Sequence, residues 1–300
     1  MVASPPPDRP FPAAMVNITN RCTLRCGHCF IYRDGNPNDP AAEMDAPEML
    51  AKILERKRRH GLRTMLWMGG EPLLRPDVLE PGVRHFLHNT ITTNGTLDLL
   101  DLPQTQYVVS LDGPPEINDQ IRGQGTFERV MRTLGRVPGG FGPAVLVQCV
   151  VTRMNGDKLE DLVQALLPTC IQGLTFSFYV PTREDRSPHT WGSLERRDAA
   201  VLEVMRLKQR YPHLIRNRDR SLELMLSPNA KAVTDDCPSR KLVLPLYLEG
   251  RDFVTPYCCY GNDVDCDLCG AWVVFYLAAR LEPDRPRAEE HGRTAGPNTT

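Results

Sequence analysis

Short apolar segments alternate with amphipathic segments along most of the chain. The predicted strands are 15–19, 63–68, 90–93, 107–111, 144–151 and 174–180. The predicted helices are 47–60, 76–87, one with Thr126 as its N-cap, 159–167 and 194–210. Strands that alternate with helices form βαβ units, whose strands pair in parallel. The pattern therefore predicts an α/β fold with six such units.

The ends of the first helix can be read from single residues. Asp45 is a good N-cap, Pro47 suits the first turn, and Glu48 stands three residues after the cap. Gly61 favours a C-terminal stop. One apolar face is predicted from Met49, Leu50, Ile53 and Leu54.

The regular alternation covers only part of the chain, which suggests four regions. We expect a disordered leader over 1–14, a barrel domain over 15–211, a cysteine-bearing region over 212–282 and a disordered tail over 283–300. The last two regions show no further βα rhythm. The tail is polar and contains proline and glycine, which favours disorder.

Composition excludes several classes of protein. In 300 residues, 41% are hydrophobic and 24% charged, which is typical of a globular chain. The net charge of −1 gives no sign of a nucleic-acid or anionic membrane partner. The longest apolar run, near 271–279, is too short to span a bilayer, and the N-terminus lacks a signal-peptide pattern. We expect a cytoplasmic protein.

The ten cysteines carry the strongest chemical signal. Cys22, Cys26 and Cys29 form a CxxxCxxC motif near the front of the chain. In a reducing compartment, closely spaced cysteines indicate a metal site. Three thiolates can hold three irons of one [4Fe–4S] cluster and leave the fourth iron open for a ligand. A zinc site, with His28 as a fourth ligand, is the alternative.

Three motifs in order resemble the radical S-adenosylmethionine (SAM) superfamily. They are CxxxCxxC, Gly69-Gly70-Glu71-Pro72, and Ser110-Leu111-Asp112-Gly113 followed by Asn118–Arg122. The resemblance implies a partial (β/α)6, TIM-like radical SAM barrel. It also implies SAM as cofactor, a cluster on the three cysteines, and an external one-electron reductant of the flavodoxin or ferredoxin type. His28 stands where the family more often has an aromatic residue.

The same resemblance suggests which residues contact SAM. Backbone groups at Gly69, Gly70 and Glu71 are expected to hold the methionine amino group, and Arg122 its carboxylate. The remaining cofactor candidates follow or end strands: Asn94, Ser110, Asp112 and Asn155. In this family the reduced cluster cleaves SAM, and the resulting 5′-deoxyadenosyl radical abstracts hydrogen from an unactivated C–H bond.

A second group of cysteines lies near the end of the chain: Cys237, Cys258, Cys259, Cys266 and Cys269. The group resembles the shortened SPASM, or Twitch, region of radical SAM enzymes, with an unusually short gap before its CxxC. Four cysteines can ligate a second [4Fe–4S] cluster, with zinc as the alternative. Five cysteines for four positions leave either Cys258 or Cys259 spare. A spare thiol beside the substrate could donate a hydrogen atom, as in radical SAM aminoglycoside and peptide epimerases, or could simply be buried.

Polar strand positions suggest the substrate. Alternating polar residues are expected to face the barrel lumen: Asn17, Thr19, Thr92, Asn94, Ser110, Asp112, Gln148, Thr175, Ser177 and Tyr179. They favour a polar small molecule such as a sugar or amino sugar. Five aspartates near the second cysteine group would suit a cationic substrate, or simply form a solvated surface. Only about twenty residues precede Cys22, so we expect no separate leader-binding domain of the kind that many peptide-modifying relatives carry.

These observations favour epimerisation of a sugar or aminoglycoside-type metabolite, as in antibiotic biosynthesis, with a cysteine as hydrogen donor. Four alternatives stay open. They are dehydrogenation of an alcohol with the second cluster as electron acceptor, addition of the adenosyl radical to a substrate, peptide modification, and a non-enzymatic zinc or iron–sulfur protein. The motifs that resemble a SAM cradle disfavour the last.

Overall fold

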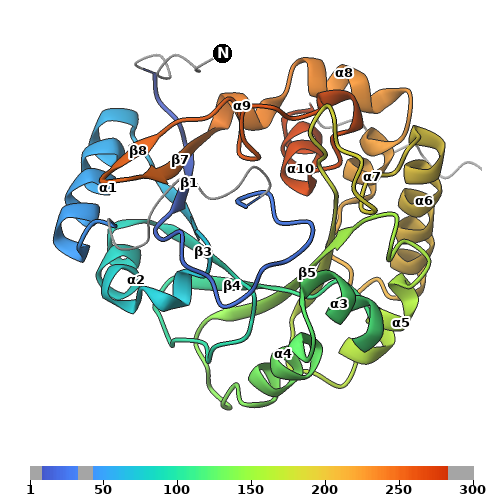
Figure 1. The fold of residues 1–300 in the computed structure, drawn as a ribbon, viewed down its shortest axis with the longest axis horizontal. Coiled ribbons are helices and arrows are strands. Elements are labelled where there is room, and N and C mark those ends of the chain that lie inside the picture. Colours follow the sequence, from blue (N-terminus) through green and yellow to red (C-terminus); the bar gives the residue numbers. More distant parts are fainter. Residues whose placement is uncertain (1–8, 33–42, 283–300) are drawn as a thin grey trace, which may run out of the picture.

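The strands form one curved sheet (Figure 1). In the computed structural model, which describes residues 9–32 and 43–282, eight strands pair in the order β6-β5-β4-β3-β2-β1-β7-β8. Their bounds are β1 (Ala13–Asn17), β2 (Thr64–Met68), β3 (His88–Thr93), β4 (Thr105–Ser110), β5 (Ala144–Val151), β6 (Gly173–Phe178), β7 (Val243–Glu249) and β8 (Asp252–Val254). β1 to β6 pair in parallel, which confirms the predicted strands and the partial barrel.

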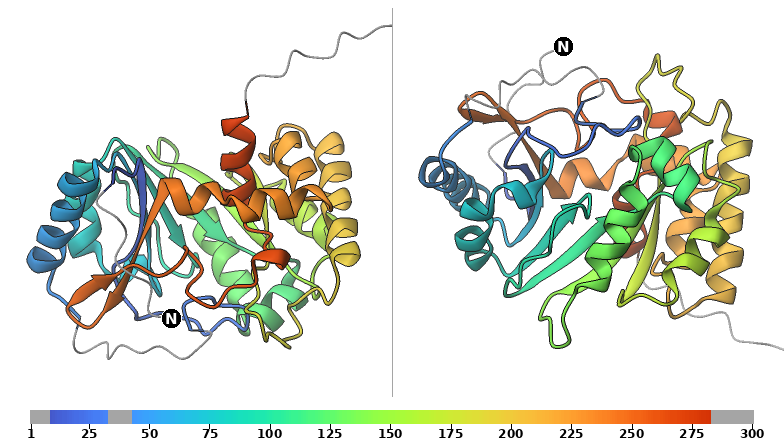
Figure 2. Two further views of the ribbon diagram at one scale, coloured as in Figure 1. Left: turned by 90° about the horizontal axis from the view of Figure 1, so that it is seen from above. Right: turned by 60° about the horizontal axis from the view of Figure 1, so that its bottom comes forward.

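Helices surround the sheet on its outer side (Figure 2). Their bounds are α1 (Ala46–His60), α2 (Pro76–Gly82), α3 (Pro115–Arg122), α4 (Thr126–Gly135), α5 (Leu159–Leu166), α6 (Leu194–Arg210), α7 (Asp219–Met225), α8 (Asn229–Asp235), α9 (Pro238–Leu242) and α10 (Trp272–Leu281). Short 3-10 turns cover Pro72–Leu74, Val83–His85 and Cys266–Leu268. None of the described helices combines the length and hydropathy that crossing a membrane requires.

Helix ends follow the predicted signals with two differences. Asp45 accepts a hydrogen bond from the Glu48 amide, and Gly61 ends α1 in the left-handed conformation. Thr126, however, is the first residue of α4, and Gly125 with φ 72° is its N-cap. The helix predicted over 76–87 ends at Gly82, one residue after Pro81, and the chain continues as a 3-10 turn from Val83.

The N-terminal and C-terminal regions contribute more to the sheet than the pattern predicted. Phe11, in the expected leader, is buried, and its amide bonds to the His60 carbonyl. β7 lies beside β1 in parallel and extends the sheet. The sequence pattern did not predict this strand, because it contains Pro245 and proline argues against a central strand. β8 pairs only with Tyr247–Glu249, so Pro245 has a single neighbouring strand.

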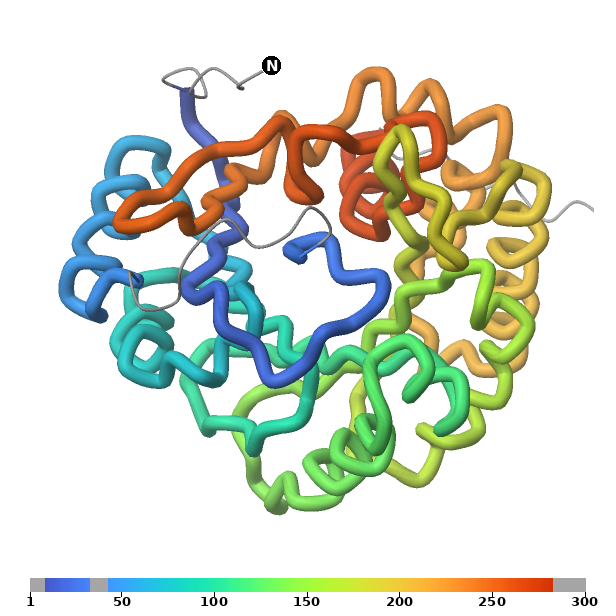
Figure 3. The backbone as a smooth tube through the Cα atoms, in the orientation of Figure 1, coloured from blue at the N-terminus to red at the C-terminus, as the bar shows by residue number. Residues whose placement is uncertain are grey.

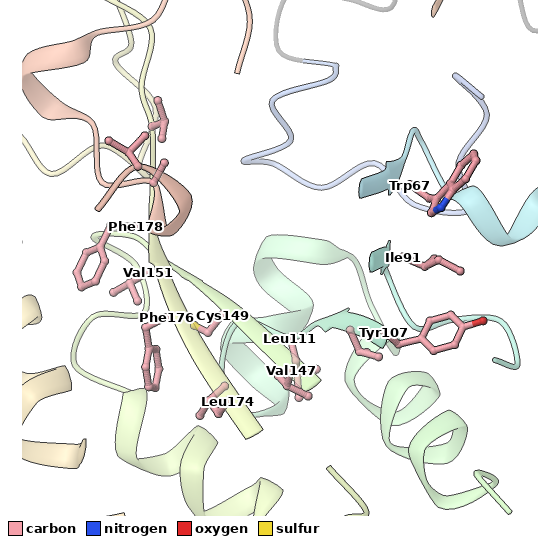
Figure 4. Close-up of a cluster of buried hydrophobic side chains, with 14 of the residues drawn as sticks. Trp67, Ile91, Tyr107, Leu111, Val147, Cys149, Val151, Leu174, Phe176 and Phe178 are labelled. Atoms are coloured by element: carbon pink, nitrogen blue, oxygen red, sulfur yellow. The ribbon is translucent and has the colours of Figure 1, made fainter. Parts of the chain in front are cut away.

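The hydrophobic core lies between the outer face of the sheet and the helices (Figure 4). Alternate strand residues point into it, among them Tyr107, Val147 and Phe176. Cys149 is fully buried in this core, whereas Cys170 is exposed. The remaining strand residues are left to face the lumen.

The lumen face is polar on one side and apolar on the other. Gln148 and Thr175 hydrogen-bond across β5 and β6, as the polar pattern predicted. Near β1, β2 and β7 a separate apolar cluster forms from Met15, Val243 and Cys259, with Ala13, Leu66, Met68, Tyr247, Tyr260 and Leu277 packed against it. The polar lumen residues predicted on β5 and β6 are therefore brought together, but the apolar surface near β1, β2 and β7 was not predicted. The apolar part arises because β7 and the Cys259 loop cover β1, which the strand pattern did not include.

Candidate active site

The predicted site residues gather at one edge of the sheet. The cysteine loop follows β1, Gly69 and Gly70 follow β2, Asn94 follows β3, Ser110 ends β4, and Asn155 follows β5. All of these are carboxyl ends of parallel strands, the usual place for sites in barrels. Figure 3 shows the loop after β1 crossing the middle of the ring at this edge.

The first cysteine loop brings its three thiols together. Electrostatic interactions link Cys22, Cys26 and Cys29 pairwise. The Cys22 sulfur accepts hydrogen bonds of 3.5 Å from the Leu24 amide and from Asn94 Nδ2. Asn94 also donates to Thr23 Oγ1 at 2.9 Å. The end of β3 therefore holds the start of the motif in place.

Donors beside these thiols suit a negatively charged cluster. Arg122 Nη1 lies 3.8 Å from the Cys26 sulfur. Burial raises the pKa of Cys26 to about 11, although Arg122 opposes the shift. In a [4Fe–4S] cluster each thiolate binds a different iron, so the sulfurs need not meet at one point. Within the described ranges no three His, Cys, Asp or Glu side chains are placed to hold a single ion. The residues present thus fit a cluster.

The two glycines after β2 allow backbone to pack against the cysteine loop. A Cβ on Gly70 would lie 2.1 Å from the Arg21 carbonyl oxygen, and one on Gly69 2.5 Å from that of Thr19. The Gly70 amide donates a hydrogen bond to the Thr19 carbonyl oxygen at 2.7 Å, and the Glu71 amide donates one to the Arg21 carbonyl oxygen at 2.8 Å. Any side chain here would push the loop after β1 away from the strand edge.

Glu71 and Asn155 act as braces. The buried Glu71 carboxylate accepts from Leu73 N at 3.1 Å, Thr93 Oγ1 at 2.8 Å and Asn94 N at 2.8 Å. Burial raises its pKa against these bonds. The Asn155 amide donates to the Asp112 carbonyl at 2.7 Å. Both side chains therefore join neighbouring strand ends.

Asp112 organises the opposite side of the loop. Its Oδ2 lies 2.6 Å from Arg122 Nε and 2.7 Å from His28 Nε2, and its Oδ1 accepts from Val150 N at 2.8 Å. Burial alone would raise the pKa of Asp112, but Arg122 and His28 hold it well below its usual range. The polar residue at position 28 is thereby explained, because it anchors the loop to β4.

His189, in the loop between β6 and α6, was missed by the sequence analysis. Its ring lies 5.6 Å from that of His28, and its Nε2 would be 2.9 Å from a Cβ on Gly27. Burial and the nearby His28 lower its pKa to about 4. No local spacing could have found it, since 160 residues separate the two imidazoles.

The second cysteine group assembles from three segments. Cys237 precedes α9, Cys258 lies in the loop after β8, Cys266 begins a 3-10 turn and Cys269 directly follows that turn. Cys269 interacts electrostatically with Cys237, Cys258 and Cys266. Burial raises the pKa of Cys258 to about 11 and that of Cys269 to about 12.

The two adjacent cysteines point to different surroundings. Cys258 packs with the main core, which also contains Cys237, Cys266 and Cys269. Cys259 packs with Met15 and Val243 on the lumen side. Reciprocal backbone bonds between Cys258 and Gly261 close a tight turn here.

The two cysteine loops meet through an aromatic contact. The ring of Phe30, next to Cys29, lies 5.0 Å from the ring of Tyr260, next to Cys259. The acidic residues nearby are paired: Asp235 and Asp267 with Lys231, Asp236 with Lys241, and Asp263 with Arg183, while Asp265 accepts the Asp267 amide. These pairs favour the interpretation of a solvated surface over a cation site.

Comparison with known proteins places the chain in a family. Residues 16–166 match the model of the Radical SAM superfamily. The chain belongs to the radical SAM superfamily. Molybdenum cofactor biosynthesis protein 1 of Bos taurus is 33% identical over 184 residues, covering 55% of this chain and 28% of that protein. Mycofactocin maturase MftC of Mycobacterium tuberculosis is 30% identical over 155 residues, covering 48% and 39%. The matches thus span well under half of these radical SAM relatives.

Solved structures share the fold. Streptococcus suis SuiB bound to S-adenosylmethionine superposes with a TM-score of 0.63 at 16% identity, covering 80% of this chain and 59% of that one. The structure of anSMEcpe with bound AdoMet gives a TM-score of 0.57 at 20% identity, covering 72% of this chain and 64% of that one. The partial barrel is therefore the radical SAM fold, and SAM with one [4Fe–4S] cluster are the cofactors that the family implies.

Proposed function

We propose that this chain is a radical SAM enzyme that abstracts hydrogen from a polar small molecule and returns a hydrogen atom from Cys259. Cys22, Cys26 and Cys29 would hold the SAM-cleaving cluster. The chemistry that a reduced cluster supplies there is one-electron cleavage of SAM to methionine and a 5′-deoxyadenosyl radical. The observation that carries the proposal is that Cys259 packs with Met15 and Val243, whereas the other four cysteines of its group pack with the main core, although Cys259 still interacts electrostatically with Cys258 and Cys237.

Cys258 is the better candidate for the fourth ligand of a second cluster. It packs with the core that contains Cys237, Cys266 and Cys269, and it interacts electrostatically with Cys237 and Cys266. Cys259 packs beside Met15 of β1, whose strand ends at the first cysteine loop. Cys259 is buried, and the neighbouring Tyr260 ring contacts Phe30 of the first cysteine loop.

For the cofactor, we assign the residue roles that the resemblance to the radical SAM superfamily implies. Backbone groups of Gly69, Gly70 and Glu71 would receive the methionine amino group, and Arg122 its carboxylate. Arg122 is already oriented by Asp112, so the guanidinium keeps its position without SAM. Asn94, Ser110 and Asn155 would line the same strand edge.

Hydrogen return by Cys259 gives epimerisation. The substrate carbon radical takes the hydrogen atom from the thiol on the face opposite to abstraction, leaving a thiyl radical. One electron from the external flavodoxin or ferredoxin-type reductant and one proton restore the thiol. The pKa of Cys259, raised by burial to about 12, keeps it in the S–H form that can donate a hydrogen atom.

Peptide modification is the second candidate. One structure of the same fold is described as SuiB bound to precursor peptide SuiA, with a TM-score of 0.60. A substrate screen that contains amino sugars and short peptides separates the two candidates, because only one class should accelerate SAM cleavage.

The test compares wild-type protein with Cys259→Ala in deuterated water. Wild type should yield an inverted product with one deuterium at the inverted carbon, since thiol hydrogens exchange with solvent. Cys259→Ala should still form 5′-deoxyadenosine but no inverted product, whereas Cys170→Ala, an exposed control, should behave as wild type. An oxidised product without deuterium would identify a dehydrogenase instead.

A further inference from the structure

A fully buried guanidinium lies against the second cysteine group. Arg197, on α6, has no exposed surface. Its Nη1 donates to the Cys269 carbonyl oxygen at 3.0 Å, and its Nη2 to that of Met225 at 2.7 Å. One side chain therefore joins α6, the end of α7 and the CxxC segment.

The charge of Arg197 is only weakly balanced by protein groups. The Asp198 carboxylate lies beside the guanidinium, with its Oδ1 3.5 Å from Arg197 Nη2. Asp198 is 19% exposed, and its Oδ2 accepts from the Ser227 amide at 2.9 Å. Arg197 Nε is buried without a hydrogen-bond partner. Burying a cation costs free energy, and one partly exposed carboxylate at 3.5 Å offsets only part of that cost, so further negative charge nearby would stabilise Arg197.

The four cysteines can supply that charge. Arg197 interacts electrostatically with Cys269, which in turn interacts with Cys237, Cys258 and Cys266. Thiolates around an iron–sulfur core leave the whole cluster net negative, and reduction adds one more negative charge. The potentials of such clusters depend on local charge and hydrogen bonds.

Arg240, on the other side of the group, offers a contrast. It interacts with Cys237 and Cys266 but is only partly buried, and it also bonds to the Thr234 and Asp235 carbonyls. Water can screen its charge, whereas no water reaches Arg197. The larger electrostatic effect should therefore come from Arg197.

We propose that Arg197 is the counter-charge of the second cluster and raises its reduction potential, as a positioning residue that also holds the CxxC segment. This rests on the second cluster of the proposed function. Removing the charge should make one-electron reduction of that cluster about tenfold less favourable, a shift of about 59 mV to lower potential.

The test separates charge from hydrogen bonding. Arg197→Lys keeps the charge with fewer donors, and Arg197→Gln keeps hydrogen bonding without charge. Arg196→Gln, one position away and exposed, is the matched control. Each is combined with Cys22→Ala, Cys26→Ala and Cys29→Ala in the full chain, so that only the second cluster gives a signal. The potential is read by a redox titration followed by electron paramagnetic resonance, and iron content is measured in parallel.

The Lys and control variants should keep the parent potential, and the Gln variant should shift down or lose its cluster. A parent-like potential in the Gln variant, or an equal shift or equal iron loss in both Arg197 variants, would overturn the charge role. If the chain forms no second cluster, the triple-alanine parent will hold no iron at all. That result is distinct from a second cluster that assembles but whose potential does not depend on Arg197.

Discussion

The two cysteine groups of this protein are built in opposite ways. Cys22, Cys26 and Cys29 lie within eight residues on one loop, and the braces of that loop come from the ends of β3 and β4. The second group collects cysteines from segments up to 32 residues apart, and a helix of the barrel, α6, supports it through Arg197. The local motif names its three ligands in the sequence, whereas the assembled group leaves Cys258 and Cys259 as alternatives that differ only in their packing.

The largest expected effect separates the two groups by iron content. Replacing Cys22, Cys26 and Cys29 together with alanine should lower the iron of anaerobically reconstituted protein from about eight to about four per chain. SAM cleavage should stop, because no cluster remains beside the SAM cradle. Iron analysis and a 5′-deoxyadenosine assay check this. Zinc in protein purified without oxygen would contradict it.

The next effect concerns the brace on the first loop. Arg122→Ala should weaken SAM binding by about 1.5–3 kcal/mol, because a charge-assisted contact to the methionine carboxylate is lost. Both clusters should still assemble, since Cys26 keeps its place in the loop. Equilibrium binding of SAM measures the effect. An unchanged dissociation constant would restrict Arg122 to its ion pair with Asp112.

A smaller effect should appear as a pH dependence. Because Arg122 and His28 outweigh burial and hold the pKa of Asp112 below its usual value, its ionised form stabilises the fold above about pH 4. That stability is lost as pH falls below this value. Denaturant unfolding of cluster-free protein between pH 5 and pH 3 should therefore be less pH-dependent in Asp112→Asn. Asp98→Asn, on the exposed surface, should keep the wild-type slope.

The features that could be predicted from the sequence are those with local signals, and the features that could not depend on contacts between distant residues. The six parallel strands and α1 were readable because their signals are local: alternation, the Asp45 cap and the Gly61 stop. Strand β7 could not be predicted, because Pro245 interrupts its apolar pattern and its partner strand β1 lies more than 220 residues away. His189 and Arg197 were missed for the same reason. Their roles arise from contacts that no spacing encodes.

The smallest expected effect tests the Asp45 N-cap of α1, which was predicted from local sequence signals. Asp45→Ala should lower the free energy of unfolding by about 1 kcal/mol, because the Glu48 amide loses its acceptor. Asp157→Ala, at an exposed loop position, should change it by less than about 0.5 kcal/mol. Chemical denaturation of the two variants side by side is sufficient. Equal losses would show that the cap contributes nothing specific.

The most direct measurement of the central claim compares the neighbours Cys258 and Cys259. If Cys258 faces the second cluster and Cys259 the lumen, Cys258→Ala should reduce the iron content from about eight to about four per chain. Cys259→Ala should keep about eight and should still cleave SAM. Iron counted on both single variants after the same anaerobic reconstitution decides the matter. Loss of the second cluster from Cys259→Ala, with Cys258→Ala intact, would contradict the assignment and place the spare thiol away from the substrate.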